Sequence, residues 1–181
     1  EAGLKAARDA FYCGDIAATI VDFHANNGGM LTAADMAGYR SEIEPPAHVS
    51  YGDVDVYTCG PWCQGPVLVQ SLALLEGMDL AAMGHNSLDY IHTLTEAIKL
   101  ACADRERYYG DPRFEDVPMA ELLSPGYNKT RRELIRNDIA WPGMPPAGKA
   151  GGSLRSDEYV HPAAEGPQSL DLDTSYVCVT D

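Results

Sequence analysis

Thr174 is the residue whose type and setting could do chemistry. It follows a long stretch rich in proline and glycine, and it opens a β-branched and aromatic run that continues to Asp181. A threonine hydroxyl is a weak nucleophile unless a base takes its proton, and the α-amine of an N-terminal threonine can be that base. Exposing this amine requires cleavage of the Asp173–Thr174 bond. The hydroxyl can achieve this by attacking the Asp173 carbonyl, which gives an ester that water hydrolyses.

The local pattern also fits an ordinary threonine at the start of a strand, and this is the simpler interpretation because threonine is common in strands. Residues 174–181 are expected to form a strand, and a strand needs a neighbour to satisfy its backbone groups. We therefore expect the protein to continue beyond Asp181. The helical pattern at Glu1 gives the same expectation for the other end.

Residues 1–136 show mainly helical patterns, with one predicted β-hairpin, so the expected fold class is α+β. The hairpin turns at Gly52-Asp53. Thr32 is expected to cap a short helix, with Asp35 completing a capping box, and Asn86 is expected to cap the longest helix. Residues 137–173 lack periodicity and are rich in proline and glycine, which predicts a flexible, loosely packed segment. The helices are predicted at residues 1–11, 16–26, 32–39, 66–76, 87–109, 121–123 and 127–135.

Two further groups could carry chemistry. His92 lies one helical turn from both Asp89 and Glu96 and could bind a metal or transfer protons with them, but a half-buried histidine on a surface helix is the simpler interpretation. Cys59 and Cys63 could be nucleophiles. No neighbouring base can be named, and no second pair stands at zinc spacing, so we expect structural thiols and no metal.

Residues 104–107, Asp-Arg-Glu-Arg, form a charge run at the end of the longest predicted helix. The polar side of this helix, which also carries Glu96, is expected to be a solvated face with ion pairs between neighbouring turns. An arginine here that clamps a carboxylate is the alternative.

The composition limits the classes of binding partner and the compartment. A net charge of −14 and an isoelectric point near 4.6 disfavour nucleic acid and anionic membrane surfaces. No apolar run approaches the roughly 20 residues that span a bilayer. Five cysteines without an evident disulfide framework favour a reducing, cytoplasmic compartment. A periplasmic location stays open if a signal peptide precedes Glu1.

Ordered motifs along nearly the whole chain resemble the γ-glutamyltransferase (γ-glutamyltranspeptidase) family. The similarity is interrupted only in the segment rich in proline and glycine. The motifs are Gly28-Gly29-Met30-Leu31-Thr32 followed by Asp35 and Tyr39, Gly60-Pro61-Trp62-Cys63-Gln64-Gly65-Pro66, Leu75-Glu76-Gly77, Glu96-Ala97-Ile98-Lys99-Leu100-Ala101 through Ala103-Asp104-Arg105, and Gly110-Asp111-Pro112.

This resemblance implies part of an N-terminal nucleophile hydrolase αββα sandwich, mostly the helical part of the large subunit. Residues 1–136 would be the C-terminal half of that subunit, residues 137–173 the segment before the cleavage site, and residues 174–181 the first strand of the small subunit. Thr174 would be the nucleophile and, after cleavage, the N-terminal base. Asp173 would precede the scissile bond. The resemblance implies a γ-glutamyl amide substrate, the small subunit of the same precursor as partner, and no metal or organic cofactor.

Two motifs depart from the common family pattern. Thr174-Ser175-Tyr176 stands where the family commonly has Thr-Thr-His, and Pro61-Trp62-Cys63-Gln64-Gly65 replaces an approach rich in proline and serine. Both are closer to a branch that includes oxamate amidohydrolase-like proteins, which makes a short amide such as oxamate the rival substrate. The family's other substrate ligands would lie before Glu1 and after Asp181, so residues 1–181 alone are expected to be inactive. A non-catalytic helical interaction domain is the alternative function.

Overall fold

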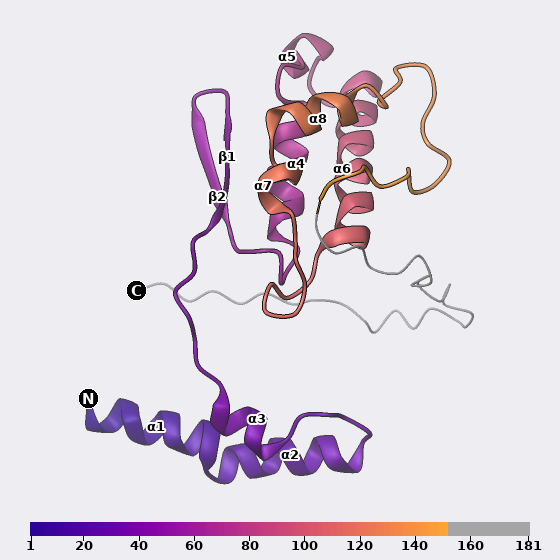
Figure 1. Ribbon diagram of the computed structural model, residues 1–181. Coiled ribbons are helices and arrows are strands. Elements are labelled where there is room, and N and C mark those ends of the chain that lie inside the picture. Colours follow the sequence, from indigo (N-terminus) through magenta and orange to yellow (C-terminus); the bar gives the residue numbers. More distant parts are fainter. Residues whose placement is uncertain (152–181) are drawn as a thin grey trace. The chain divides into compact units, whose positions relative to one another are not determined.

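The structure is a computed structural model that describes residues 1–151. Residues 152–181, which include Asp173 and Thr174, lie outside the described part. The chain divides into two compact units, the first covering residues 1–44 and the second beginning at Pro45 (Figure 1).

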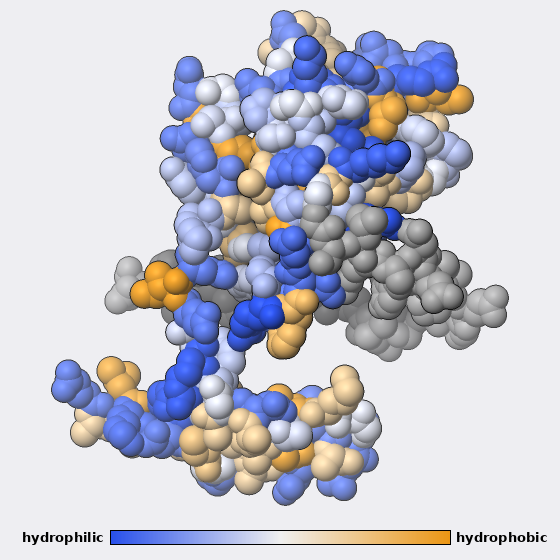
Figure 2. All heavy atoms as spheres, in the orientation of Figure 1, coloured by the Kyte–Doolittle hydropathy of each residue, from blue (hydrophilic) through white to orange (hydrophobic). Residues whose placement is uncertain are grey.

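The first unit contains helices α1 (Ala2–Cys13), α2 (Asp15–Asn26) and α3 (Ala33–Gly38). Thr32 caps α3. Its hydroxyl accepts a hydrogen bond from the Asp35 amide at 3.2 Å, and the Asp35 carboxylate accepts one from the Thr32 amide at 2.9 Å, so the predicted capping box is confirmed. The unit buries few side chains and leaves many apolar ones exposed, as the tan and orange residues in Figure 2 show.

The second unit begins with the predicted hairpin, β1 (Ala47–Tyr51) paired antiparallel with β2 (Val54–Thr58). Gly52 adopts a φ of 55° at the turn, a conformation that glycine reaches without steric cost. The hairpin packs on α4 (Gly65–Leu75), which begins with a proline in its first turn as expected.

Helix α6 (Leu88–Tyr108) runs beside α4, and the two form the centre of this unit (Figure 1). The short helix α5 (Leu80–Met83) lies between them in the sequence. The fully buried core joins leucines of α4 to alanines of α6, and small residues at such a contact let two helix backbones approach closely. Its members are Leu74, Leu75, Ala97, Leu100 and Ala101.

The cap of α6 differs from the prediction by one residue. Ser87 is the N-cap, and its hydroxyl accepts a hydrogen bond from the Tyr90 amide at 3.1 Å. Asn86 instead adopts a φ of 56°, a left-handed conformation that asparagine tolerates better than most residues. Both residues are good capping types, so the sequence alone could not rank them.

Helices α7 (Met119–Leu122) and α8 (Pro125–Arg132) complete the second unit. Arg132 of α8 satisfies the last carbonyls of α4, because its Nε donates to the oxygen of Leu74 at 2.6 Å and its Nη2 to the oxygen of Ala73 at 3.0 Å. A second apolar cluster unites the end of α6 with α7 through Tyr108, Tyr109 and Leu122.

Residues 137–151 form no helix or strand. Within residues 1–151, no helix is long and apolar enough to cross a bilayer. The observed elements agree with the α+β class and its helical bias. Several residues of this irregular stretch, residues 137–151, hydrogen-bond to the helices.

Candidate functional site

The second unit contains a buried carboxylate between α4 and α6. Asp104 of α6 and Gln70 of α4 are both fully buried. Gln70 Nε2 donates a hydrogen bond to Asp104 Oδ2 at 2.6 Å, and the Tyr109 hydroxyl donates to Gln70 Oε1 at 3.2 Å. A polar chain therefore crosses an otherwise apolar helix interface.

Arg131 of α8 supplies the positive charge for this carboxylate. Its Nη2 lies 3.1 Å from Asp104 Oδ1, and its side chain is only 5% exposed. The same nitrogen donates to the carbonyl oxygen of Leu100 at 3.4 Å. A buried ion pair is stable only when further hydrogen bonds offset its desolvation, and Gln70 provides one of them.

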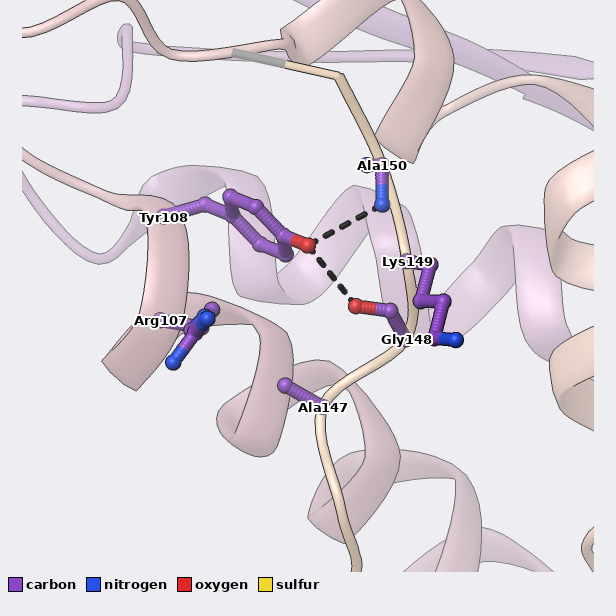
Figure 3. Close-up of a pocket in the computed structure, with 6 residues that line it drawn as sticks. All are labelled: Arg107, Tyr108, Ala147, Gly148, Lys149 and Ala150. Atoms are coloured by element: carbon purple, nitrogen blue, oxygen red, sulfur yellow. Dashed lines mark hydrogen bonds between the residues drawn. The ribbon is translucent and has the colours of Figure 1, made fainter. Parts of the chain in front are cut away.

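Asp104 also binds the backbone of residues 137–151, which form no helix or strand. The Gly148 amide donates to Asp104 Oδ1 at 2.8 Å. The Tyr108 hydroxyl donates to the Gly148 carbonyl at 2.8 Å and accepts from the Ala150 amide at 3.0 Å (Figure 3). We call Gln70, Asp104, Tyr108, Tyr109 and Arg131 the buried polar cluster. A pocket of about 470 Å³ lies beside it, lined by Arg107, Tyr108 and residues 147–150.

A side chain at position 148 would have to displace its neighbours. A Cβ added there would lie 2.1 Å from the Tyr127 hydroxyl and 2.8 Å from Arg131 Cδ. Burial raises the pKa of the Tyr127 phenol, and the nearby Asp104 carboxylate raises this pKa further. The same two causes raise the pKa of Tyr109. Both phenols therefore stay protonated at any physiological pH, and Tyr109 remains a hydrogen-bond donor to Gln70.

Glu96 of α6 provides a second anchor at Trp141. The Trp141 amide donates to Glu96 Oε2 at 3.2 Å. Lys99 Nζ donates both to Glu96 Oε1 at 2.6 Å and to the Trp141 carbonyl at 2.7 Å, so it bridges the two residues. His92 Nε2 donates to the Arg136 carbonyl at 2.6 Å.

Glu121 of α7 provides a third anchor, because its Oε2 accepts from the Gly151 amide at 2.7 Å. We call residues 136–151 the anchored segment. It leads directly into the residues that contain Asp173 and Thr174.

Two predictions about charged residues were wrong. Asp104 and Glu96 were expected on the solvated side of the longest helix, but they are 0% and 1% exposed. Their burial is explained by partners far along the chain, at Arg131 and Trp141. Trp141, Gly148, Ala150 and Gly151 make the contacts above. The looseness expected of residues 137–173 as a whole stays a prediction.

His92 and Glu96 each bind backbone or lysine groups, which agrees with the simpler interpretation of a structural histidine. In the described part of the chain, no three His, Cys, Asp or Glu side chains are grouped so that they could hold a metal. Arg105 pairs with Glu106 and with the Gln64 side chain at 2.8 Å, so it is engaged within the protein.

The structure brings Cys59 and Cys63 together, with 2.8 Å between their sulfur atoms. Both residues are recognisable in the sequence as possible nucleophiles, but nothing in the sequence predicts such a short distance.

The predicted catalytic residues Asp173 and Thr174 lie outside the described residues, so their roles stay predictions. Sequence reasoning missed Gln70, Arg131 and Gly148. The one available signal was Gln70, a polar residue within the most apolar helix. Nothing local marks Arg131 or Gly148, whose importance depends on tertiary contacts.

Comparison with known proteins supplies the family. The sequence profile described as Gamma-glutamyltranspeptidase matches residues 3–181. The chain belongs to the gamma-glutamyltranspeptidase family. The acylase ACY 1 proenzyme of Pseudomonas sp. (strain SE83) is 37% identical to it over 155 residues, which are 84% of this chain and 27% of that protein. The glutathione hydrolase proenzyme of Escherichia coli (strain K12) is 36% identical over 135 residues, 74% of this chain and 23% of the relative.

Among solved structures, the gamma-glutamyltranspeptidase of Helicobacter pylori aligns with a TM-score of 0.68 and 32% identity, covering 77% of this chain and 41% of that one. The described residues thus form the helical part of an N-terminal nucleophile hydrolase large subunit, as the resemblance implied. The chain spans about a quarter of the length of these curated relatives.

Proposed function

We propose that this chain is part of a precursor that cleaves itself between Asp173 and Thr174, and that Thr174 then hydrolyses or transfers the acyl group of a γ-glutamyl or related short amide. The observation that carries the proposal is the family match, which extends through Thr174 to residue 181. Two of the most similar relatives are named as proenzymes, of an acylase and of a glutathione hydrolase. Membership in this family favours the enzyme over a non-catalytic interaction domain.

Cleavage needs only the chain's own groups and water. The Thr174 hydroxyl attacks the Asp173 carbonyl carbon, the peptide C–N bond breaks, and the acyl group moves to the threonine oxygen as an ester. Water hydrolyses this ester, which leaves a carboxylate on Asp173 and a free α-amine on Thr174. In the mature enzyme this amine accepts the hydroxyl proton while the oxygen attacks the substrate amide. The amine product leaves, and water or a second amine resolves the ester.

Three acidic side chains support this proposal by holding the chain ahead of the cleavage site. Asp104, Glu96 and Glu121 bind the anchored segment at Gly148, Trp141 and Gly151. Fixing the chain as far as Gly151 leaves 22 residues, 152–173, between the last anchor and Thr174. Positioning a nucleophile in this way lowers the entropic cost of the reaction.

Mass spectrometry of the full-length protein tests the cleavage. A chain that begins at Thr174 is expected from the wild-type protein. Thr174→Ala should remain uncut, while Ser175→Ala, which removes the neighbouring hydroxyl, should be cut as the wild type is. A folded wild-type protein that stays intact would refute the proposal, and so would a new N-terminus at Ser175.

The substrate class requires a separate measurement on the cleaved protein. A γ-glutamyl anilide and oxamate represent the two candidate classes, and release of the amine or ammonia reports turnover. The departures at Ser175-Tyr176 and at Trp62-Cys63 favour a short amide over glutathione. Faster turnover of the γ-glutamyl compound would assign the chain to the glutathione-cleaving members instead.

A further inference from the structure

The junction between β2 and α4 holds two thiols in one turn. Cys59 directly follows the last residue of β2, and Cys63 precedes Gly65, the first residue of α4. Residues 60–63 form a tight turn, in which the Cys63 amide donates to the Gly60 carbonyl at 3.4 Å. This turn brings the two sulfur atoms to 2.8 Å.

Gly65 makes room for this pair. A Cβ at position 65 would lie 2.8 Å from the Cys59 sulfur and 2.1 Å from Thr58 Oγ1. Because glycine has no side chain, Cys59 can lie against the start of α4. The Gly65 amide donates to the Cys63 sulfur at 3.3 Å, so the first turn of the helix contacts that residue as well.

The two cysteines differ in their surroundings. Cys59 is exposed, whereas Cys63 is half-buried. The hydrogen bond from Cys63 is the main cause that lowers the pKa of the Cys59 thiol, with smaller contributions from Thr58 and backbone amides. An accessible cysteine with thiolate character is the type that attacks a disulfide, and a second cysteine beside it can resolve the product.

We propose that Cys59 and Cys63 are a redox-active dithiol that forms a reversible intrachain disulfide by exchange with a low-molecular-weight disulfide. The proposal is carried by the 2.8 Å distance, the exposure of Cys59 and the space left by Gly65, and it is independent of the chemistry proposed for Thr174. Converting the pair to a disulfide shortens the sulfur–sulfur distance to about 2.05 Å. That change requires only a small movement of two side chains.

Two exchange steps complete the reaction. The Cys59 thiolate attacks one sulfur of the small disulfide, forms a mixed disulfide and releases one thiolate. The Cys63 sulfur then loses its proton and attacks the Cys59 sulfur, which forms the Cys59–Cys63 bond and releases the second thiolate. The protein thiols lose two electrons, the small disulfide gains them, and the protons end on the two released thiols.

Peptide mapping of the full-length wild-type protein tests the pair. The protein is equilibrated in buffers of reduced and oxidised glutathione at increasing oxidised fraction, quenched with N-ethylmaleimide and digested. As the oxidised fraction rises, Cys59 and Cys63 should both lose their reactivity to the alkylating agent. They should appear together in a peptide that lacks two hydrogens, and dithiothreitol should restore both thiols. Cys13, an exposed cysteine in the other unit, should carry only mixed disulfide.

Variants establish the order of the two steps. Cys63→Ser should accumulate glutathione on Cys59, and Cys59→Ser should lose the intrachain link. Cys13→Ser is the matched control and should keep the link. Full alkylation of Cys59 and Cys63 in every buffer would overturn the proposal. So would a link from Cys63 to Cys178, or a Cys63→Ser protein that gains glutathione on Cys13 and none on Cys59.

Discussion

Replacing Asp104 by asparagine should release the anchored segment from α6. The substitution keeps the shape of the side chain but removes the charge that pairs with Arg131 at 3.1 Å. It also places an amide nitrogen against either Gln70 Nε2 or the Gly148 amide, both of which are donors. Breaking a buried ion pair by removing one partner costs about 3–5 kcal/mol. Since about 1.4 kcal/mol corresponds to a factor of ten, opening of this site should become at least about a hundredfold more frequent.

Hydrogen exchange of the full-length protein measures this opening. Peptides that cover residues 144–151 contain the Gly148, Ala150 and Gly151 amides, which the structure shows as bonded. These amides should exchange at least about a hundredfold faster in Asp104→Asn, because exchange reports the free energy of local opening. Glu106→Gln on the same helix is the matched control. Its carboxylate is 38% exposed, and such pairs contribute about 0–1 kcal/mol, so the control should change exchange by no more than about fivefold.

A double variant separates anchoring from general stability. Asp104→Leu with Arg131→Met removes both buried charges, which should return the melting temperature toward the wild-type value. The Gly148 amide would still lack its acceptor, so fast exchange of residues 144–151 should persist. Wild-type exchange in Asp104→Asn would refute the anchoring role, and so would full protection in the double variant.

Two other predictions concern close contacts. Gly148→Ala should destabilise the second unit by about 1–3 kcal/mol, because its Cβ would overlap the Tyr127 hydroxyl. Its melting temperature should fall below that of Gly126→Ala, whose new Cβ would meet nothing within 4 Å, and equal values would contradict the predicted overlap. Thr32→Ala should cost the first unit about 1 kcal/mol through loss of the capping box with Asp35. Faster hydrogen exchange across α3 would report this loss, and unchanged exchange would show that the cap contributes little.

The elements that the sequence predicted well are those set by local chemistry. Thr32 and Asp35 are three residues apart, and the hairpin turn at Gly52 depends on adjacent residues, so both could be recognised from the chain alone. Most helix boundaries differ by one or two residues, as at Asn86 and Ser87, where neighbouring side chains compete to cap. The last helix ends at Arg132, three residues before its predicted end, and α5 was not predicted.

The burial of charged residues could not be predicted in the same way. Asp104 and Glu96 have helical neighbours typical of a solvated face, and their burial depends on Arg131 and on Trp141, which lie 27 and 45 residues further along. Sequence periodicity reports only contacts within one element. The family could be recognised from the sequence because its motifs occur in order along the chain. The role of Thr174 is a prediction that the cleavage experiment tests.

The anchors of residues 141–151 act mainly on peptide groups. Glu96, Asp104 and Glu121 accept from backbone amides, and Tyr108 and Lys99 donate to backbone carbonyls. Hydrogen bonds of this kind fix the course of the backbone and place few requirements on the side chains of residues 141–151. Positions such as Ala147 and Lys149 can therefore vary among relatives without loss of the path. Proline is the residue that this region must avoid at each donating amide, because it has no N–H to give.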